Sequence, residues 1–351
     1  MTVRQPRVGV VIALALLVVA AAVASTACGA RTELDDQALP AGASSSGSGS
    51  SGSGASSGCT GSGVLASDDA MIMGIAVDAT NVYWVDTVGD VMKTALCGGA
   101  PTKLASGVSV TGGCFGGSSS GSVGFAIDAT NAYWADDSGA VSSVPLAGGA
   151  KVGLGPTEDT PIGALTVNDG ELYFAAAGML GVMTTQGDGA RLLGGVVAGA
   201  GLAVDATNVY WAGNGAFSTP KAGGAYAQLA SSPLPASGVV ADATNVYWAS
   251  NDYTQHYAVM STPKTGGPSV TLATGQAAAN AFAVDDANLY WTTCVMAGAV
   301  TKVPVGGGTP VVISANAMAP AAIALDATSI YWAENDPSGT GSGTIRRVTP
   351  K

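Results

Sequence analysis

A short phrase that contains every tryptophan of this chain recurs between residues 75 and 332. The first copy runs from Ile75 to Trp84 and reads Asp-Ala-Thr-Asn-Val-Tyr-Trp from Asp78 onward. The other tryptophans end copies of the same phrase, at Trp134, Trp211, Trp248, Trp291 and Trp332. A weaker copy has Asn168 in place of the aspartate and Phe174 in place of the tryptophan. Successive copies lie 37 to 50 residues apart, and self-similarity at such a spacing is typical of repeat architectures.

Each repeat unit is expected to form four short strands. In the second unit, apolar and aromatic residues predict strands over Gly124–Asp128, Ala132–Ala135 and Ala140–Val144. Asn and Asp side chains, which can cap their own backbone, occupy the turns between these strands. The pair Gly148–Gly149 predicts a further turn before a short fourth strand. Four antiparallel strands per unit are the pattern of a β-propeller blade.

The two ends of the repeat region complement each other. The last unit has an expected third strand over Thr344–Val348, and the chain then ends at Lys351 without a fourth. Upstream of the first unit, Val64–Ser67 is similar to the fourth strand expected at Lys103–Ser106. A strand supplied from the other terminus would close the ring and remove an unpaired edge. We therefore predict an all-β chain with a single closed β-propeller over residues 60–351, in which an N-terminal strand completes the last of seven four-stranded blades.

The Tyr-Trp phrase also carries a resemblance to known families. Followed by Val85-Asp86 or Ala135-Asp136, it resembles the YWTD repeats of lipoprotein-receptor propellers and of bacterial propellers on exported chains. The resemblance covers residues 60–351 and implies a propeller, but it transfers no ligand-binding side chain. The receptor propellers have six blades, so six is the alternative here, with the Phe174 copy as an insertion.

The N-terminus has the pattern of an export signal. Arg4 and Arg7 precede the uncharged apolar run Val8–Val23, and small residues follow, which together predict a signal peptide over residues 1–27. The alternative is a transmembrane anchor, because the run approaches the lower limit of about 17 residues for spanning a bilayer. Residues 41–58 are almost entirely Gly and Ser, so we expect residues 28–59 to act as a flexible tether.

Thr26-Ala27-Cys28 resembles the end of the lipobox of bacterial lipoproteins, although Ser25 stands where Leu is usual. The resemblance implies a lipid on Cys28 and a membrane partnership through that lipid. Because Gly29 rather than Asp follows, an outer-membrane location in the bacterial cell envelope is expected. The remaining cysteines form an even set, which predicts disulfides without fixing their pairing: Cys59, Cys97, Cys114 and Cys294.

Charge and repetition limit the candidate functions. The formal net charge of -11 argues against nucleic acid as a partner. The repeated aspartates are interpreted as acceptors that lock their turns, not as calcium ligands, and the tryptophans as packing between blades. These aspartates are Asp78, Asp128, Asp205, Asp242, Asp285 and Asp326.

The segments that differ between units are the candidate binding regions. A loop in the fifth unit holds the only histidine, and its candidate binding residues are Asp252, Tyr253, Gln255, His256 and Tyr257. A second long segment spans Gly107–Val123. No nucleophile motif or metal-ligand spacing is present, so no catalytic residue, metal or cofactor is assigned. The expected function is a binding or scaffold module for a protein, peptide or polymer. The alternative is a hydrolase or lyase that resembles gluconolactonase-like propellers and acts on a lactone or sugar.

Overall fold

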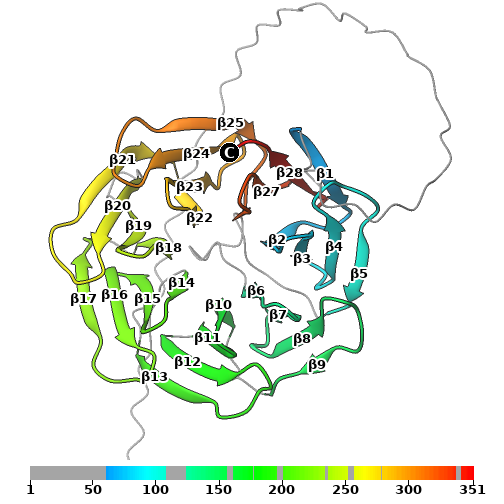
Figure 1. Cartoon of the computed structure of the whole chain (residues 1–351), viewed down its shortest axis with the longest axis horizontal. Helices are drawn as coiled ribbons and strands as arrows, with labels where there is room; N and C mark the ends of the chain where they lie inside the picture. Colours follow the sequence, from blue (N-terminus) through cyan, green and yellow to red (C-terminus); the bar gives the residue numbers. More distant parts are fainter. Residues whose placement is uncertain are drawn as a thin grey trace, which may run out of the picture. The chain divides into compact units, whose positions relative to one another are not determined.

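The described part of the chain is entirely β-structure. The computed structural model describes residues 61–107, 124–155, 161–176, 178–195, 201–233, 236–251, 257–277, 279–336 and 341–351. These residues form seven antiparallel sheets of four strands each, which surround a central channel as the blades of a propeller (Figure 1). The predicted seven-bladed ring is confirmed. The six-bladed alternative is wrong, because the copy with Phe174 forms a complete blade of its own.

The strands of a blade follow one another from the channel outward. Blade 1 contains β2 (Ile72–Val77), β3 (Asn81–Asp86), β4 (Val91–Ala95) and β5 (Thr102–Ala105). Blade 2 contains β6 (Phe125–Ile127), β7 (Asn131–Ala135), β8 (Val141–Pro145) and β9 (Val152–Gly153). Blade 3 contains β10 (Ile162–Asn168), β11 (Glu171–Ala176), β12 (Met179–Thr184) and β13 (Arg191–Gly195). Blade 4 contains β14 (Leu202–Val204), β15 (Asn208–Gly213), β16 (Gly215–Pro220) and β17 (Ala227–Ser231).

The remaining blades follow the same order until the chain ends. Blade 5 contains β18 (Ser237–Ala241), β19 (Asn245–Asn251), β20 (Tyr257–Pro263) and β21 (Val270–Gln276). Blade 6 contains β22 (Ala279–Val284), β23 (Asn288–Thr293), β24 (Gly298–Pro304) and β25 (Val311–Ala317). Blade 7 takes β26 (Ala322–Leu325), β27 (Ile330–Asn335) and β28 (Gly343–Val348) from the C-terminal end and β1 (Gly63–Asp68) from the N-terminal end.

The N-terminal strand closes the ring as expected from the sequence. β1 pairs antiparallel with β28, so that Val64 lies opposite Arg346 and Ser67 opposite Thr344. The innermost strands β2, β6, β10, β14, β18, β22 and β26 each contact their two neighbours, and the circuit returns from β26 to β2. The described residues contain no helix long and apolar enough to cross a membrane.

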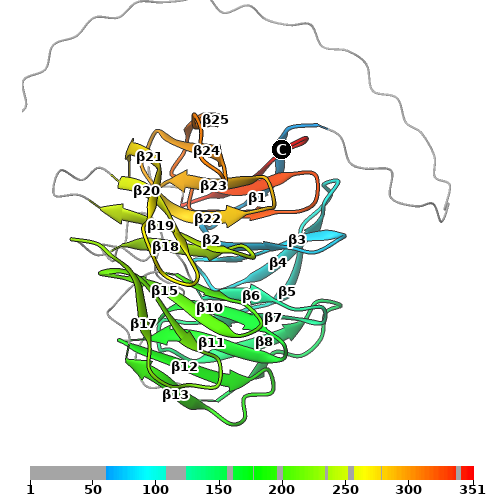
Figure 2. The same cartoon turned by 60° about the vertical axis from the view of Figure 1, so that its left-hand side comes forward.

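Successive strands run in opposite directions, so their connections alternate between two faces of the ring (Figure 2). We define the turn face as the one that holds the Asp turns after the first strands and the double-glycine turns after the third strands. In the double-glycine turn of blade 1, Gly98 and Gly99 have φ values of 84° and 144°, which favour glycine. We define the loop face as the opposite one, where second strands lead to third strands and each blade leads to the next.

The core lies between blades. Neighbouring residues of a strand point to opposite sides of its sheet, so the tyrosine and tryptophan of one phrase face different blades. Tyr83 of blade 1 packs with Trp134 of blade 2, and Tyr133 packs with Phe174 of blade 3. The same pairing continues through all seven junctions and ends with Tyr331 of blade 7 against Trp84 of blade 1. The interpretation of the tryptophans as packing between blades is confirmed.

Candidate functional site

The repeated aspartates organise the turn face. Asp78 Oδ1 accepts hydrogen bonds from the backbone N–H groups of Thr80 and Asn81, both at 2.7 Å, and Oδ2 accepts one from the Tyr83 hydroxyl at 2.7 Å. The same contacts recur in the other blades that keep the aspartate, with the tyrosine as donor: Asp128–Tyr133, Asp205–Tyr210, Asp242–Tyr247, Asp285–Tyr290 and Asp326–Tyr331. The turn-locking interpretation is therefore confirmed.

The tyrosine hydroxyl was not foreseen as a partner of the turn, although the constant spacing of Asp and Tyr was visible in the sequence. Blade 3 lacks the repeated aspartate, but its interface tyrosine still donates a hydrogen bond to a carboxylate. There the Tyr173 hydroxyl donates to Glu171, and Lys221 Nζ lies 2.6 Å from Asn168 Oδ1. A carboxylate acceptor for the interface tyrosine is thus present in every blade.

These hydrogen bonds set the protonation of both groups. Burial works to raise the pKa of Asp128, but the hydrogen bonds from Tyr133 and from the backbone of Thr130 and Asn131 outweigh it and hold that pKa below its ordinary value. Burial, followed by the hydrogen bond to Asp128, raises the pKa of Tyr133 to about 12. At neutral pH the pair is therefore a charged acceptor with a neutral donor.

Lysines from the next blade complete several of these turns. Lys264 Nζ lies 2.8 Å from Asp205 Oδ2, and Lys351 Nζ lies 2.8 Å from Asp285 Oδ2. Protein donors therefore occupy carboxylate oxygens that a calcium ion would need. Across the described ranges, no group of three or more His, Cys, Asp or Glu side chains is placed to hold a metal ion.

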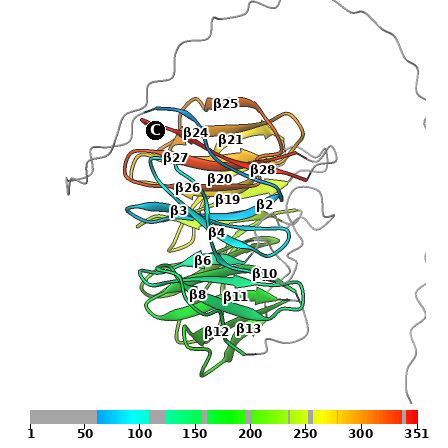
Figure 3. The same ribbon diagram turned by 90° about the vertical axis from the view of Figure 1, so that its right-hand side faces the viewer.

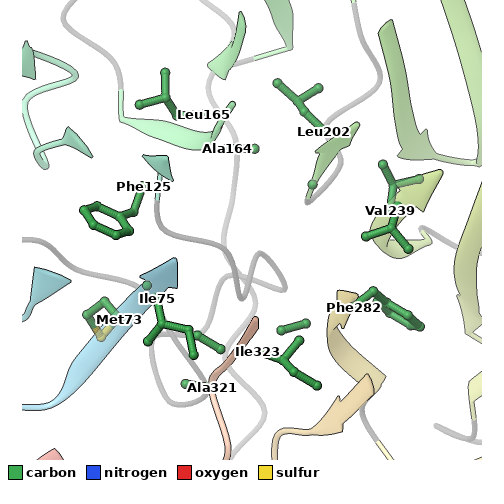
Figure 4. Close-up of a pocket in the computed structure, with 15 residues that line it drawn as sticks. Met73, Ile75, Phe125, Ala164, Leu165, Leu202, Val239, Phe282, Ala321 and Ile323 are labelled. Atoms are coloured by element: carbon green, nitrogen blue, oxygen red, sulfur yellow. The ribbon is translucent and has the colours of Figure 1, made fainter. Parts of the chain in front are cut away.

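The central channel is lined by apolar side chains from the innermost strands and holds a cavity of about 180 Å³ (Figure 4). One large residue of each blade borders it: Ile75, Phe125, Leu165, Leu202, Val239, Phe282 and Ile323. Glycines make room for these side chains, since a Cβ on Gly74 would lie 2.8 Å from Phe125 Cβ. The side chains that line the channel are apolar, and its described lining contains no acidic, basic or nucleophilic side chain.

The two candidate binding segments begin and end on the loop face. The first lies between β19 and β20, and its residues Asp252, Tyr253, Gln255 and His256 are outside the described residues. Tyr257 is described as the first residue of β20, where it is half-buried and packs against the core between blades 5 and 6. Burial raises its pKa. The second segment connects β5 to β6, and only its first residue, Gly107, is described.

The cysteines are only partly described. Cys28, Cys59 and Cys114 lie outside the described residues, whereas Cys97 and Cys294 are described and neither is free. Cys97 follows β4 on the turn face of blade 1, and Cys294 follows β23 on the loop face of blade 6. A disulfide requires Cα atoms within about 7 Å. Cys97 and Cys294 therefore do not pair with each other, and the remaining pairings stay predictions.

Comparison with known proteins supports the fold. No protein-family model matches the chain, and no curated protein sequence matches it. The WD40 β-propeller domain of Doa1 is 12% identical, with a TM-score of 0.62 over 82% of this chain and 97% of that chain. The computationally designed Ika8 protein is 13% identical, with a TM-score of 0.55 over 80% and 98%. A chain of a nidogen/laminin complex is 19% identical, with a TM-score of 0.45 over 58% and 79%. The likenesses to the Doa1 domain and to Ika8 concern the propeller fold alone.

We predict that the Asp–Tyr pairs limit stability at both ends of the pH range. The lowered pKa of Asp128 gives stability that is present above about pH 3.8, the ordinary value, and is lost as the pH falls. The raised pKa of Tyr133 gives stability that is present below pH 10 and is lost as the pH rises through about 12. Replacing Tyr133 by Phe should cost roughly 1–3 kcal/mol at pH 7, since a hydrogen bond to a charged acceptor is removed.

Denaturant unfolding of the Tyr133→Phe variant at pH 7 measures this loss. Thr265→Ala, an exposed substitution on the same face, is the control and should change the free energy of unfolding by less than about 0.5 kcal/mol. A Tyr133→Phe variant as stable as the control would show that the hydroxyl does not support the turn.

Proposed function

We propose that this protein is a binding module that recognises a protein, peptide or polymer ligand with its loop face. The observation that carries the proposal is that the large differences in connection length between the repeats lie on that face. The turn face repeats the same Asp turn in six of the seven blades. On the loop face, β15 and β16 are joined by Asn214 alone, whereas nineteen residues (106–124) separate β5 from β6. Variable loops on a rigid scaffold are where binding residues concentrate.

We also propose that the ring is anchored at the bacterial cell envelope through a lipid on Cys28. The signal peptide over residues 1–27 and the tether over residues 28–59 are part of this proposal, and the outer membrane is the expected location. The lipobox resemblance at Thr26-Ala27-Cys28 supports it. So does the first described residue, Gly61, whose carbonyl accepts a hydrogen bond from Arg347 Nε at 3.3 Å on the turn face. The described chain therefore enters the ring on the turn face, opposite the loop face.

The same contact favours one disulfide pairing. Arg347 donates to the carbonyl groups of both Gly61 and Leu96, and so holds the start of the ring close to the turn that follows β4. Cys59 precedes Gly61 by two residues, and Cys97 follows Leu96 directly. We therefore propose the pairs Cys59–Cys97 and Cys114–Cys294.

The loop-face proposal predicts that substitutions on the loop face weaken ligand binding and that substitutions on the turn face do not. Tyr253→Ala combined with His256→Ala should weaken ligand binding at least tenfold. Thr265→Ala combined with Asp286→Ala, two exposed positions on the turn face of blades 5 and 6, should leave it unchanged. The measurement is in two steps: crosslinking of purified protein to envelope fractions identifies the ligand, and titration of each variant with that ligand gives the affinity. Equal loss in both double variants, or loss only in the turn-face variant, contradicts the proposal.

The anchor proposal predicts that wild-type protein partitions into the detergent phase of a cell extract and that Cys28→Ala partitions into the aqueous phase. Removal of the only acylated sulfur is the physical cause. Metabolic labelling with a fatty-acid analogue provides the second measurement. Identical partitioning of both proteins would rule out lipidation at Cys28 and would leave the loop-face proposal untouched.

The disulfide proposal predicts two linked peptides in a protease digest prepared without reductant. Mass spectrometry should find Cys59 joined to Cys97 and Cys114 joined to Cys294. A digest reduced before analysis is the control, in which both linked masses should disappear. A peptide in which Cys59 is linked to Cys294 would contradict the proposed pairing.

A further inference from the structure

The ring closes at a seam that is unlike its other junctions. β1 runs along the outside of blade 7 toward the loop face, and the chain then crosses to the innermost strand of blade 1 (Figure 3). A hollow of about 390 Å³ lies at this crossing. Its charged lining residues come from both sides of the seam and are Asp68, Asp69, Asp86, Asp90 and Lys103.

Asp68 joins the closing strand to blade 1. It is the last residue of β1, and its Oδ2 accepts a hydrogen bond from Trp84 Nε1 at 2.6 Å, while Oδ1 accepts one from the Ala70 backbone N–H at 3.1 Å. The fourth strands of other blades share the Leu-Ala-Ser or Leu-Ala-Thr sequence that precedes it. At the matching position those blades have Gly107, Ser232 and Gly275, so none of them carries a charge there.

Asp86 faces the same hollow from the end of β3. Only 2% of its surface is exposed. Its Oδ1 accepts hydrogen bonds from the backbone N–H groups of Val88 and Asp90, both at 2.9 Å. Burial, together with the negative charges of Asp68 and Asp90, raises the pKa of Asp86 to about 6 against the pull of these hydrogen bonds. The nearby cation, Lys103, is paired with Asp90.

We propose that the contact between β1 and blade 1 is tighter in mildly acidic surroundings than at neutral pH, because a charge on Asp86 repels the carboxylate of Asp68 across the hollow that both residues line. The charged groups that face Asp86 are Asp68 on β1, Asp69 in the crossing segment, Asp90 in its own turn and Lys103 on β5. Three of these four are acidic, so ionisation of Asp86 adds net repulsion to the seam.

The direction of the pH effect follows from the two protonation equilibria. The pKa of Asp86 is about 6 in the folded ring and 3.8 ordinarily, so the folded state holds the proton more tightly than the unfolded state. The resulting stability is fully present below pH 3.8 and is lost as the pH rises through 6. The turn aspartates act in the opposite sense and at lower pH, because their pKa values are lowered. Among the described aspartates with a shifted pKa, Asp86 is the only one whose contribution to stability is lost between pH 5 and 7.

The test compares melting temperatures at pH 5 and pH 7 for full-length wild type, Asp86→Asn and Asp136→Asn. Asp136 is the matched control, because its Oδ1 accepts the same two kinds of turn hydrogen bond in blade 2, from Ser138 and Ala140, at a more exposed position. We expect the wild type and Asp136→Asn to melt a few degrees higher at pH 5 than at pH 7, and Asp86→Asn to show little difference. Because wild type and Asp86→Asn share every other ionisable group, the pH effect assigned to Asp86 is the difference between these two proteins.

Amide hydrogen exchange shows which strands are stabilised at pH 5. After correction for the intrinsic rate at each pH, β1 and β28 should exchange more slowly at pH 5 than at pH 7 in the wild type, and equally at both in Asp86→Asn. A pH effect on melting that survives in Asp86→Asn would overturn the proposal. If Asp86→Asn does not fold, carboxyl-carbon NMR of the wild type decides, since titration of Asp86 below about pH 4.5 would also overturn it.

Discussion

The ring depends on the Tyr–Trp contact between blades. A blade is a single four-stranded sheet and has no core of its own, so each of its faces must be covered by a neighbour. Consecutive residues on the second strand place Tyr83 on one side and Trp84 on the other, and each is at most 1% exposed. Each Tyr-Trp dipeptide therefore contributes one side chain to each of the two junctions that its blade makes with its neighbours. Because every junction uses the same arrangement, the last blade finds its complement only in the first, and the fold is complete only as a closed ring.

The interface tyrosine also connects packing to turn chemistry. Its ring lies in the core between blades, while its hydroxyl reaches the aspartate that locks the turn on its own blade. Blade 3 shows which part of this arrangement is essential. Its turn aspartate is replaced by Asn168, yet Glu171 takes over as acceptor for Tyr173 and Lys221 binds Asn168 from blade 4. The hydrogen bond is kept although the residues differ. The repeated aspartates are thus explained by their structural role in the turns, and ligand contacts are expected from other residues.

Periodicity decided what could be predicted from the sequence. Repetition predicted the blades, the role of the tryptophans and the closure by Val64–Ser67, because each of these follows from the four-strand pattern that the units share. It did not predict the Tyr–Asp hydrogen bond, which depends on where side chains point. Nor did it distinguish Asp86 from Asp136, since both follow the phrase at the same offset and only the fold buries one of them at the seam. The loop residues 252–256 have no counterpart in other units, so repetition carried no information about their arrangement.

A closed ring of equal repeats must still contain one junction that is made from both ends of the chain. That junction has contacts of its own. The Asn335 side chain accepts from the Ile72 N–H and donates to the Ile72 carbonyl, both at 2.8 Å, and the bond between Asp68 and Trp84 lies nearby on the same face. At the other six junctions the chain passes from one complete blade to the next, whereas here blade 7 is itself completed by β1, so the ring opens at the seam when β1 separates from β28. A single carboxylate there can therefore influence the whole fold, whereas the same residue type at the matching position of blade 2 affects only its own turn.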